Sequence, residues 1–450
     1  MVINCHFKLK KMKSLILKFT LLLCIVCSLI FLPNCKKDNS NNPGKINAGD
    51  STYVMDSLVY LQMQSWYLWY DKLPAKNTLN IKSYTDPQKF LNAIVYKPTD
   101  KWSFIITKEE YNMEFTQGVF YGHGFSLGLD ETGKFRIAFV FKNSDLFKAG
   151  VKRGWIIEKI NNVVPDTSNV YNLLGPSAAG IQNIFLFQRP DGTETTDTFV
   201  KKEVTENMVL YRDTFHVDNK IVGYLVFKGF LANGQNELDT TFDYFNKTGV
   251  NELVLDLRYN GGGDLDMANH LASIIAGSIA NNQTFATLTY NDIQTKNNIS
   301  IKLTNNSRSL HLTWFLAITT RGTASASEAV INGLIPYMPD SKIIGDTTYG
   351  KPVGMNVWLL SGFDYVFAPV TFKLTNSNNN IKYGDYLKGI PADKEEPDDL
   401  THDFGDRNEA CFAQALYYIQ NGNFSTSKKA TNFKNFNHHW KPSQLETEAY

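Results

Sequence analysis

Residues 321–351 read RGTASASEAVINGLIPYMPDSKIIGDTTYGK, and the rest of the chain is organised around this stretch. Small residues at 322–327 lead into Glu328 and then into spaced apolar residues, a pattern typical of a tight loop that turns into a helix. A serine in the first turn of such a helix lies beside unpaired backbone N–H groups and the positive end of the helix dipole. These donors stabilise an oxyanion, which nucleophilic attack on a carbonyl generates. The alternative is an ordinary capped helix without chemistry.

A second stretch, residues 251–264 (NELVLDLRYNGGGD), joins a strand pattern to a run of glycines. Residues 253–257 form a short apolar run bounded by turn residues, which indicates a buried strand. The run ends in Arg258 and three glycines, where the backbone can approach a ligand closely. A strand that ends in this way can supply a second oxyanion donor from the amide of Gly262 or Gly263.

Taken together, LDLRYNGGG, GTASASE and GDTTYGKP resemble the motifs of the C-terminal processing (tail-specific) peptidases, a serine-lysine family. The resemblance implies that Ser325, three places before Glu328, is the nucleophile and that Lys351 is its base. It also implies an oxyanion hole made by the N–H of Ala326 and a glycine amide of the other motif. The expected activity is that of a serine endopeptidase acting on polypeptides, without a cofactor.

One position departs from the family pattern and affects the lysine. The polar residue that orients the lysine in this family, often glutamine, lies four places after it, and that position is Met355. Asn356 or Thr348 is left as a possible substitute. A lysine with its ordinary pKa of about 10.4 is protonated at neutral pH, so the base role requires burial to lower the pKa of Lys351.

The N-terminal residues 1–35 are predicted to be a signal peptide. Lysines precede an apolar run at 19–32, which has the length of a signal-peptide core and is short for a membrane span. The run ends at Cys35 and resembles a bacterial lipoprotein signal, which implies acylation of that cysteine, a lipid-anchored protein and a place in the bacterial cell envelope. Asn34 departs from the usual small residue, and ordinary signal cleavage nearby is the alternative. Residues 36–50 are expected to form a flexible tether.

Two smaller units are predicted before the core. Residues 51–112 carry helical patterning and resemble the family's N-terminal helical region. Residues 113–205 change to strand patterning and resemble the PDZ domain of these peptidases. This resemblance implies that a loop binds the terminal carboxylate of a substrate peptide, whose strand adds to the sheet, through Gly122, His123, Gly124 and Phe125.

Composition and patterning bound the rest of the chain. The 450 residues include 43% hydrophobic residues, enough for the cores of two or three domains, and the net charge of +1 argues against nucleic-acid binding. Strand and helix patterns alternate over residues 206–425, which indicates a peptidase core with parallel strands, and 426–450 read as a polar tail. The predicted fold class is therefore multidomain α/β (α+β).

Other chemistries fit the sequence less well. Residues 345–351 match a phosphate-binding loop, but Pro352 follows where that loop needs a hydroxyl for Mg²⁺. Neither His270 nor His311 lies in a triad context, and neither the lone His123 nor the pair His438 and His439 has companion ligands, so no metal site is predicted. Cys411 is expected to be a small buried hydrophobe. The functional alternative is an inactive PDZ-bearing lipoprotein that binds protein C-termini.

Overall fold

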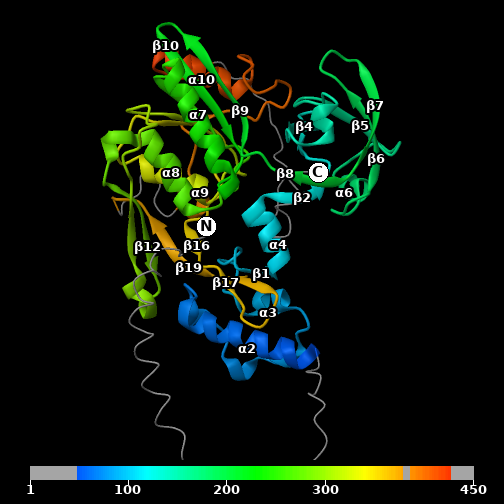
Figure 1. Cartoon of the computed structure of the whole chain (residues 1–450), viewed down its shortest axis with the longest axis vertical. Helices are drawn as coiled ribbons and strands as arrows, with labels where there is room; N and C mark the ends of the chain where they lie inside the picture. The colour runs from blue at the N-terminus through cyan, green and yellow to red at the C-terminus, as the bar shows by residue number, and fades with distance from the viewer. Residues whose placement is uncertain (1–47, 379–385, 427–450) are drawn as a thin grey trace, which may run out of the picture.

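The structure is a computed structural model that describes residues 48–378 and 386–426 (Figure 1). The predicted signal peptide with Cys35, the tether up to residue 47 and the tail from residue 427 lie outside the described residues. Among the described helices, none combines the length and the apolar character needed to cross a bilayer.

A six-stranded mixed sheet forms the centre of the core. Its order is β20-β15-β14-β11-β10-β9; the pairs from β20 to β10 are parallel, and β9 is antiparallel at one edge. The strands are β9 (Val209–Val217), β10 (Lys220–Phe227), β11 (Glu252–Asp256), β14 (Leu316–Thr319), β15 (Lys342–Gly345) and β20 (Lys394–Glu395). The parallel strands confirm the predicted α/β core.

Helices cover both faces of this sheet. One face carries α7 (Gln235–Thr248), α8 (Leu265–Ala276) and α9 (Ala326–Leu334), and the other carries α10 (Ala410–Asn421). Side chains of β10 show the division, because Leu225 packs with the first group of helices and Tyr224 packs with α10. Successive side chains of a strand point to opposite faces, so a strand covered on both sides needs an unbroken apolar run. That requirement explains the apolar residues 253–255, while Asp256, the last residue of β11, is buried as the partner of Arg258.

The N-terminal segment packs on the chain that follows Lys351. It contains α2 (Ala48–Trp66), α3 (Pro87–Ile94) and α4 (Lys108–Tyr111), as its helical patterning predicted. It also contains the strand β1 (Phe104–Thr107), which pairs with β18 (Tyr365–Ala368) in a three-stranded sheet completed by β17 (Trp358–Leu359). The segment at 51–112 therefore shares a sheet with the core, a feature that helical patterning did not predict.

A four-stranded antiparallel sheet lies next to this segment. Its order is β13-β12-β19-β16, and its strands are β12 (Thr284–Tyr290), β13 (Ile299–Lys302), β16 (Val353–Met355) and β19 (Val370–Thr375). Strand β16 begins two residues after Lys351, so this sheet holds the lysine-bearing chain. Val353, Met355 and Val370 share one buried cluster with Tyr67 and Trp102 of the N-terminal segment.

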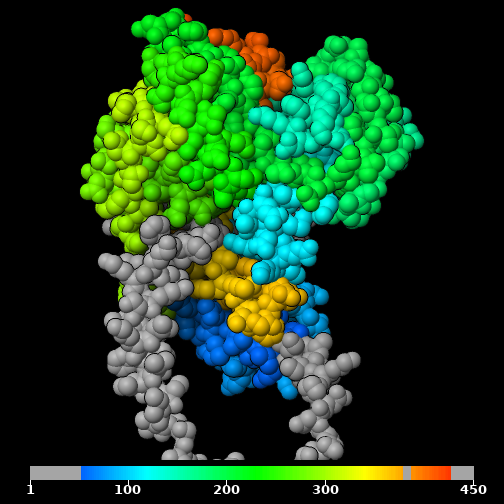
Figure 2. All heavy atoms as spheres, viewed as in Figure 1, coloured from blue at the N-terminus to red at the C-terminus, as the bar shows by residue number. Residues whose placement is uncertain are grey.

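Residues 119–205 form a lobe of their own beside the core, at the upper right of the space-filling view (Figure 2). The chain enters and leaves this lobe through an antiparallel pair, β2 (Val119–Gly122) and β8 (Lys202–Thr205). Between them lies a five-stranded antiparallel sheet with its own buried cluster of apolar residues. The elements are β3 (Phe125–Leu129), β4 (Phe135–Val140), α5 (Asp145–Lys148), β5 (Ile156–Ile160), α6 (Val170–Leu174), β6 (Gln182–Gln188) and β7 (Glu194–Val200).

Candidate active site

The predicted site residues follow three neighbouring strands of the central sheet. Gly262 and Gly263 come after β11, Ser325 comes after β14, and Lys351 comes after β15. These strands are adjacent and parallel, so their carboxyl ends meet at one edge of the sheet. The fold thereby brings together residues that are far apart in the sequence.

A buried carboxylate links the serine to the lysine. Oε2 of Glu328 accepts hydrogen bonds from the backbone N–H of Ser325 at 2.9 Å and of Lys351 at 2.8 Å. Oε1 accepts from Gly350 N at 2.7 Å and from the hydroxyl of Thr348 at 2.6 Å. Burial raises the pKa of Glu328, while these four donors favour its charged form. The motif analysis used Glu328 to locate the nucleophile, and the structure shows that it also holds both motifs together.

Ser325 has a constrained backbone and a hydroxyl without a partner. Its φ of 57° lies in the left-handed region, which is rare for residues other than glycine and costs about 1–3 kcal/mol. The side chain is only 2% exposed, and within the described part of the chain its Oγ has no hydrogen-bond partner. Buried hydroxyls are normally paired, so this atom is free to meet a group that enters the site.

Lys351 is fully buried beside two acidic residues. Burial lowers the pKa of Lys351 to about 8, and the negative charges of Asp100 and Glu328 oppose this shift. A substantial neutral fraction therefore exists near neutral pH, as a base requires. Thr348 and Asn356 are the two polar residues that the sequence left as substitutes for the lysine-orienting glutamine. The hydroxyl of Thr348 donates to Glu328, and Oδ1 of Asn356 accepts from the hydroxyl of Thr371 at 2.7 Å. Asp100 carried no signal in the sequence that could have linked it to this site.

The strand-end glycines lie directly against the serine. A Cβ on Gly262 would lie 2.8 Å from Ser325 Cβ, and the φ of Gly262 is 109°, so only glycine fits there. The N–H of Gly262 donates to Asn260 Oδ1 at 3.0 Å. In contrast, no described residue accepts a hydrogen bond from the N–H of Gly263 or of Ala326. The sequence left Gly262 and Gly263 as alternative oxyanion donors. The N–H of Gly262 is already bonded to Asn260, so Gly263 is the glycine whose N–H is available.

The predicted carboxylate-binding loop forms the turn between β2 and β3. Its imidazole, that of His123, points inward: Nε2 lies 2.7 Å from Asn183 Oδ1, and burial lowers the pKa of His123 to about 4. Gly124 has a φ of 81°, and a Cβ there would lie 2.5 Å from Ser144 Cβ. Phe125 begins β3, which is a terminal strand of its sheet. Among the described residues, no group of His, Cys, Asp and Glu side chains could hold a metal ion.

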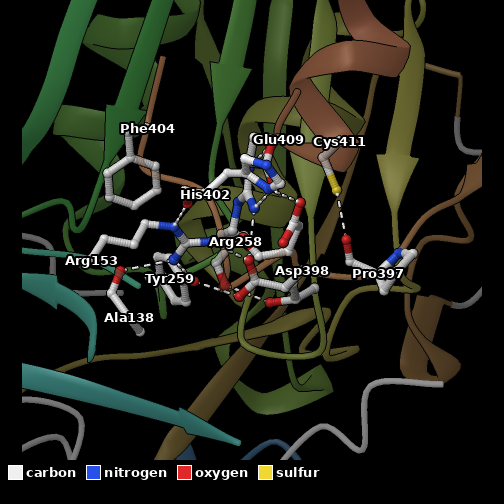
Figure 3. Close-up of polar contacts among 12 residues, drawn as sticks. Ala138, Arg153, Arg258, Tyr259, Pro397, Asp398, His402, Phe404, Glu409 and Cys411 are labelled. Atoms are coloured by element: carbon white, nitrogen blue, oxygen red, sulfur yellow. Dashed lines mark hydrogen bonds and ion pairs between the residues drawn. The ribbon is translucent and has the colours of Figure 1, made fainter. Parts of the chain in front are cut away.

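A buried arginine joins this lobe to the core (Figure 3). Arg153, in the turn before β5, donates to the backbone carbonyl of Ala138 at 2.8 Å and to the hydroxyl of Tyr259 at 2.6 Å. Its guanidinium also pairs with Asp398 Oδ1 at 2.6 Å. The same oxygen accepts from Arg258, two residues after β11, at 2.7 Å. One carboxylate therefore bridges an arginine of the lobe and an arginine of the strand that leads to the glycines.

Three acidic residues balance the two buried arginines. Arg258 pairs with Asp256 and with Glu409, each at 2.7 Å, in addition to Asp398. Burial raises the pKa of Asp398, but the charges of Arg153 and Arg258 outweigh it and lower the pKa to about 2. Asp398 is therefore charged at neutral pH, and it holds the chain after Arg258 to the lobe through Arg153 and to the core through Arg258.

Comparison with known families agrees with the predicted resemblance. The family model described as Peptidase family S41 matches residues 221–393, and that of the Peptidase S41 N-terminal domain matches residues 55–104. These ranges cover the strand-end glycines, Ser325 and Lys351, together with the helical segment that packs on them.

Curated relatives are about one quarter identical to the chain over the segments that align. A "Probable CtpA-like serine protease" of Staphylococcus epidermidis is 25% identical over 275 residues, which cover 59% of this chain and 52% of the relative. The protein of the same name in Staphylococcus saprophyticus is 27% identical over 273 residues, covering 58% and 52%. The chain thus spans about half the length of the curated relatives it matches.

A solved structure shares the fold over most of the chain. The "Putative S41 protease" of Bacteroides fragilis has a TM-score of 0.67 and 24% identity, covering 87% of this chain and 99% of its own. This agreement confirms the predicted multidomain α/β fold. Both family models match at the segments that the motifs predicted, so the chain is similar to peptidase family S41, of the C-terminal processing type, over residues 55–104 and 221–393.

Proposed function

We propose that the chain is a serine endopeptidase that uses Ser325 as its nucleophile and Lys351 as its general base. The observation that carries this proposal is the single carboxylate oxygen of Glu328 that accepts from the backbone N–H of both residues. The serine hydroxyl, which has no hydrogen-bond partner among the described residues, and the lysine, with a pKa of about 8, both follow strands that end at one edge of the sheet. A nucleophile and a base with a suitable pKa are the two groups that such catalysis needs.

The mechanism follows from the partners of each group. Ser325 Oγ attacks the carbonyl carbon of the scissile peptide bond while neutral Lys351 Nζ takes its proton. The N–H groups of Ala326 and Gly263 donate to the oxyanion, and the positive end of α9 adds to this stabilisation. The lysine ammonium then gives its proton to the leaving amine, and the carbon–nitrogen bond breaks. Water, deprotonated by Lys351, hydrolyses the acyl-enzyme and regenerates Ser325.

We also propose how the enzyme binds its substrates and where it acts. The loop at 122–125 and the terminal strand β3 would bind the C-terminus of the substrate by strand addition. The substrates would be polypeptides of the bacterial cell envelope, and Cys35 would carry the lipid that anchors the enzyme to a membrane. The lipoprotein-like signal at 1–35 supports the anchor and the location.

An active-site probe tests the enzyme proposal directly. A fluorophosphonate should label the wild-type chain at Ser325, and Ser325→Ala and Lys351→Ala should each abolish labelling. Ser341→Ala, which changes another buried serine outside the site, should leave labelling intact. Labelling that persists in Lys351→Ala would refute the role of the lysine.

The second candidate is a catalytically inactive protein that binds C-termini. The observation that favours it is Met355, which offers no polar atom where the family has a lysine-orienting residue. Binding of peptides with free C-termini, without labelling by the probe, would support this candidate over the enzyme.

A further inference from the structure

We propose that Asn260 is a positioning residue for the oxyanion hole. Its side chain fixes the glycine loop, residues 261–263, so that the N–H of Gly263 faces the carbonyl that Ser325 attacks. The inference rests on the proposed function, because it concerns the oxyanion that this attack creates. It deepens that function by naming the side chain that decides which glycine amide is the donor.

The side chain of Asn260 is fully buried and hydrogen-bonded on both sides. Its Oδ1 accepts from the backbone N–H of Gly262 at 3.0 Å, and its Nδ2 donates to the backbone carbonyl of Phe227, the last residue of β10, at 3.1 Å. The reversed amide would place its NH₂ against an N–H donor and its oxygen against a carbonyl oxygen. Only one orientation of the amide therefore satisfies both neighbours.

The peptide group between Gly262 and Gly263 has a defined direction. Its carbonyl oxygen accepts from the backbone N–H of Phe230 at 2.9 Å, and the N–H of Asp264 donates to the carbonyl of Phe230 at 2.8 Å. A trans peptide group points its C=O and its N–H in opposite directions, so the N–H of Gly263 points away from Phe230. That N–H is left without an acceptor among the described residues.

Asn260 also ties the glycine loop to the loop of the nucleophile. Its backbone carbonyl accepts from the N–H of Ala324 at 3.1 Å and from the hydroxyl of Ser327 at 2.9 Å. These two residues flank Ser325 and Ala326, and the N–H of Ala326 is the other oxyanion donor. Both contacts use the backbone of Asn260, so they survive a change of its side chain. A side-chain substitution therefore tests the orientation of the glycine loop alone.

A loop of glycines needs such a fixed point. The φ angles of Gly262 and Gly263 are 109° and 135°, and a glycine backbone has many other conformations open to it. An asparagine side chain that accepts from the N–H two residues later restricts the turn. Oxyanion donors stabilise the transition state because they are held in place before the charge develops. The hydrogen bond from Gly262 to Asn260 supplies this preorganisation.

The rate of labelling at Ser325 by a fluorophosphonate gives the first test. In Asn260→Ala the maximal labelling rate should fall about a hundredfold, the typical effect of losing one oxyanion donor. The concentration that gives half the maximal rate should stay unchanged, because ground-state binding is intact. The pH midpoint should also stay that of the wild type, since Lys351 is not affected. The final extent of labelling counts the folded sites, so a partly unfolded sample does not alter the rate.

Two inhibitors separate a role in the oxyanion hole from a merely structural role. A tripeptide aldehyde forms a bond from its carbonyl carbon to Ser325 Oγ, Lys351 takes the serine proton, and the aldehyde oxygen enters the hole. The corresponding alcohol cannot form this adduct. In Asn260→Ala the inhibition constant of the aldehyde, measured as protection against labelling, should rise about a hundredfold, in step with the loss of rate. The inhibition constant of the alcohol should not change.

Two further substitutions of Asn260 control for packing. Asn260→Leu fills the space that alanine leaves empty but makes neither hydrogen bond, so it should raise the inhibition constant of the aldehyde by the same factor. In Asn260→Asp burial favours the protonated acid, whose O–H donates to the carbonyl of Phe227 while its other oxygen accepts from Gly262. This variant should recover most of the labelling rate.

Asn291→Ala is the matched control outside the site. Asn291 is also buried, its Nδ2 donates to the carbonyls of Ser65 at 3.2 Å and Tyr67 at 2.9 Å, and its Oδ1 accepts from Gln294 N at 3.0 Å. None of these hydrogen bonds reaches the glycine loop. The substitution should lower the melting temperature but leave the labelling rate and the ratio of the two inhibition constants unchanged.

The outcomes distinguish this inference from the proposed function. A wild-type ratio of the two inhibition constants in both Asn260→Ala and Asn260→Leu would overturn the role of Asn260 and leave the enzyme proposal standing. An equal change in Asn291→Ala, or a wild type that binds the aldehyde no more tightly than the alcohol, would overturn it too. Absence of labelling in the wild type, or labelling that survives in Lys351→Ala, would overturn the proposed function and this inference with it.

Discussion

Glu328 organises the site at the scale of single residues. Its two oxygens accept four hydrogen bonds, from the backbone N–H of Ser325, Gly350 and Lys351 and from Thr348. The glutamate is completely buried. A buried carboxylate is costly unless it is fully paired, so these bonds both stabilise Glu328 and fix the two loops around it.

Replacing Glu328 by Gln should therefore damage the site more than its small change in shape suggests. The amide NH₂ would face N–H donors that now meet a carboxylate oxygen, leaving about two buried donors unpaired at a cost of about 1–3 kcal/mol each. We expect a lower melting temperature and a labelling rate at Ser325 reduced at least tenfold. Glu194→Gln, on the exposed edge strand β7, is the control and should change neither.

Some of the residue-level account could not be predicted from the sequence. The motifs identified Ser325 and Lys351, because their spacing from Glu328 and Gly350 is local. Asp100 lies in a short turn with no pattern of its own, and only tertiary packing brings its charge close enough to affect the pKa of Lys351. Whether Gly262 or Gly263 offers a free N–H depends on the side chain of Asn260, for which the sequence carries no signal.

At the scale of elements, the glycine loop after β11 and the start of α9 must approach each other closely. Gly262 has a φ of 109°, and a Cβ on it would lie 3.0 Å from Ala326 N and 2.8 Å from Ser325 Cβ. The loop can take this position because a glycine has no side chain to displace the serine.

Gly262→Ala tests that close approach. The added methyl group should push the loop from α9, misalign the oxyanion donors and lower the maximal hydrolysis rate about a hundredfold or more, the typical effect of losing one donor. Gly192→Ala is the control, because Gly192 also has a positive φ of 83° but meets nothing within 4 Å. Equal activity losses in the two variants would show that backbone strain, and not contact with Ser325, is responsible.

The N-terminal segment shows where element prediction reached its limit. Helices were predicted in this segment from its local pattern of apolar residues, and α2 and α3 lie there. Strand β1 has only four residues, and its partner β18 lies more than 250 positions away in the chain. A pairing at that distance is decided by the packing of the whole molecule.

At the scale of the whole molecule, a buried ion network connects the lobe of residues 119–205 to the strand that leads to the glycines. Arg153 and Arg258 share Asp398, and Glu409 at the start of α10 completes the network (Figure 3). Removing one partner from a buried network leaves an uncompensated charge, which is more harmful than the loss of an exposed pair.

Arg153→Met tests the importance of this connection. We expect it to destabilise the protein by about 3–5 kcal/mol, since Asp398 loses one of its two cationic partners. Arg189→Met removes another arginine of the same lobe, which packs over Trp155, and should cost far less. Chemical denaturation of both variants gives the comparison, and equal losses would contradict the importance of the network.

The pH dependence of peptide hydrolysis is the most direct test of the account, because Lys351 must be neutral to act. Burial lowers its pKa to about 8, so kcat/KM should rise with pH through a single ionisation near that value and stay low below it. Lys351→Arg should be inactive at every pH, because a guanidinium does not lose its proton in this range. A Lys351→Arg enzyme that hydrolyses peptides, or a wild-type rate that does not rise through pH 8, would contradict the assignment of Lys351 as the base.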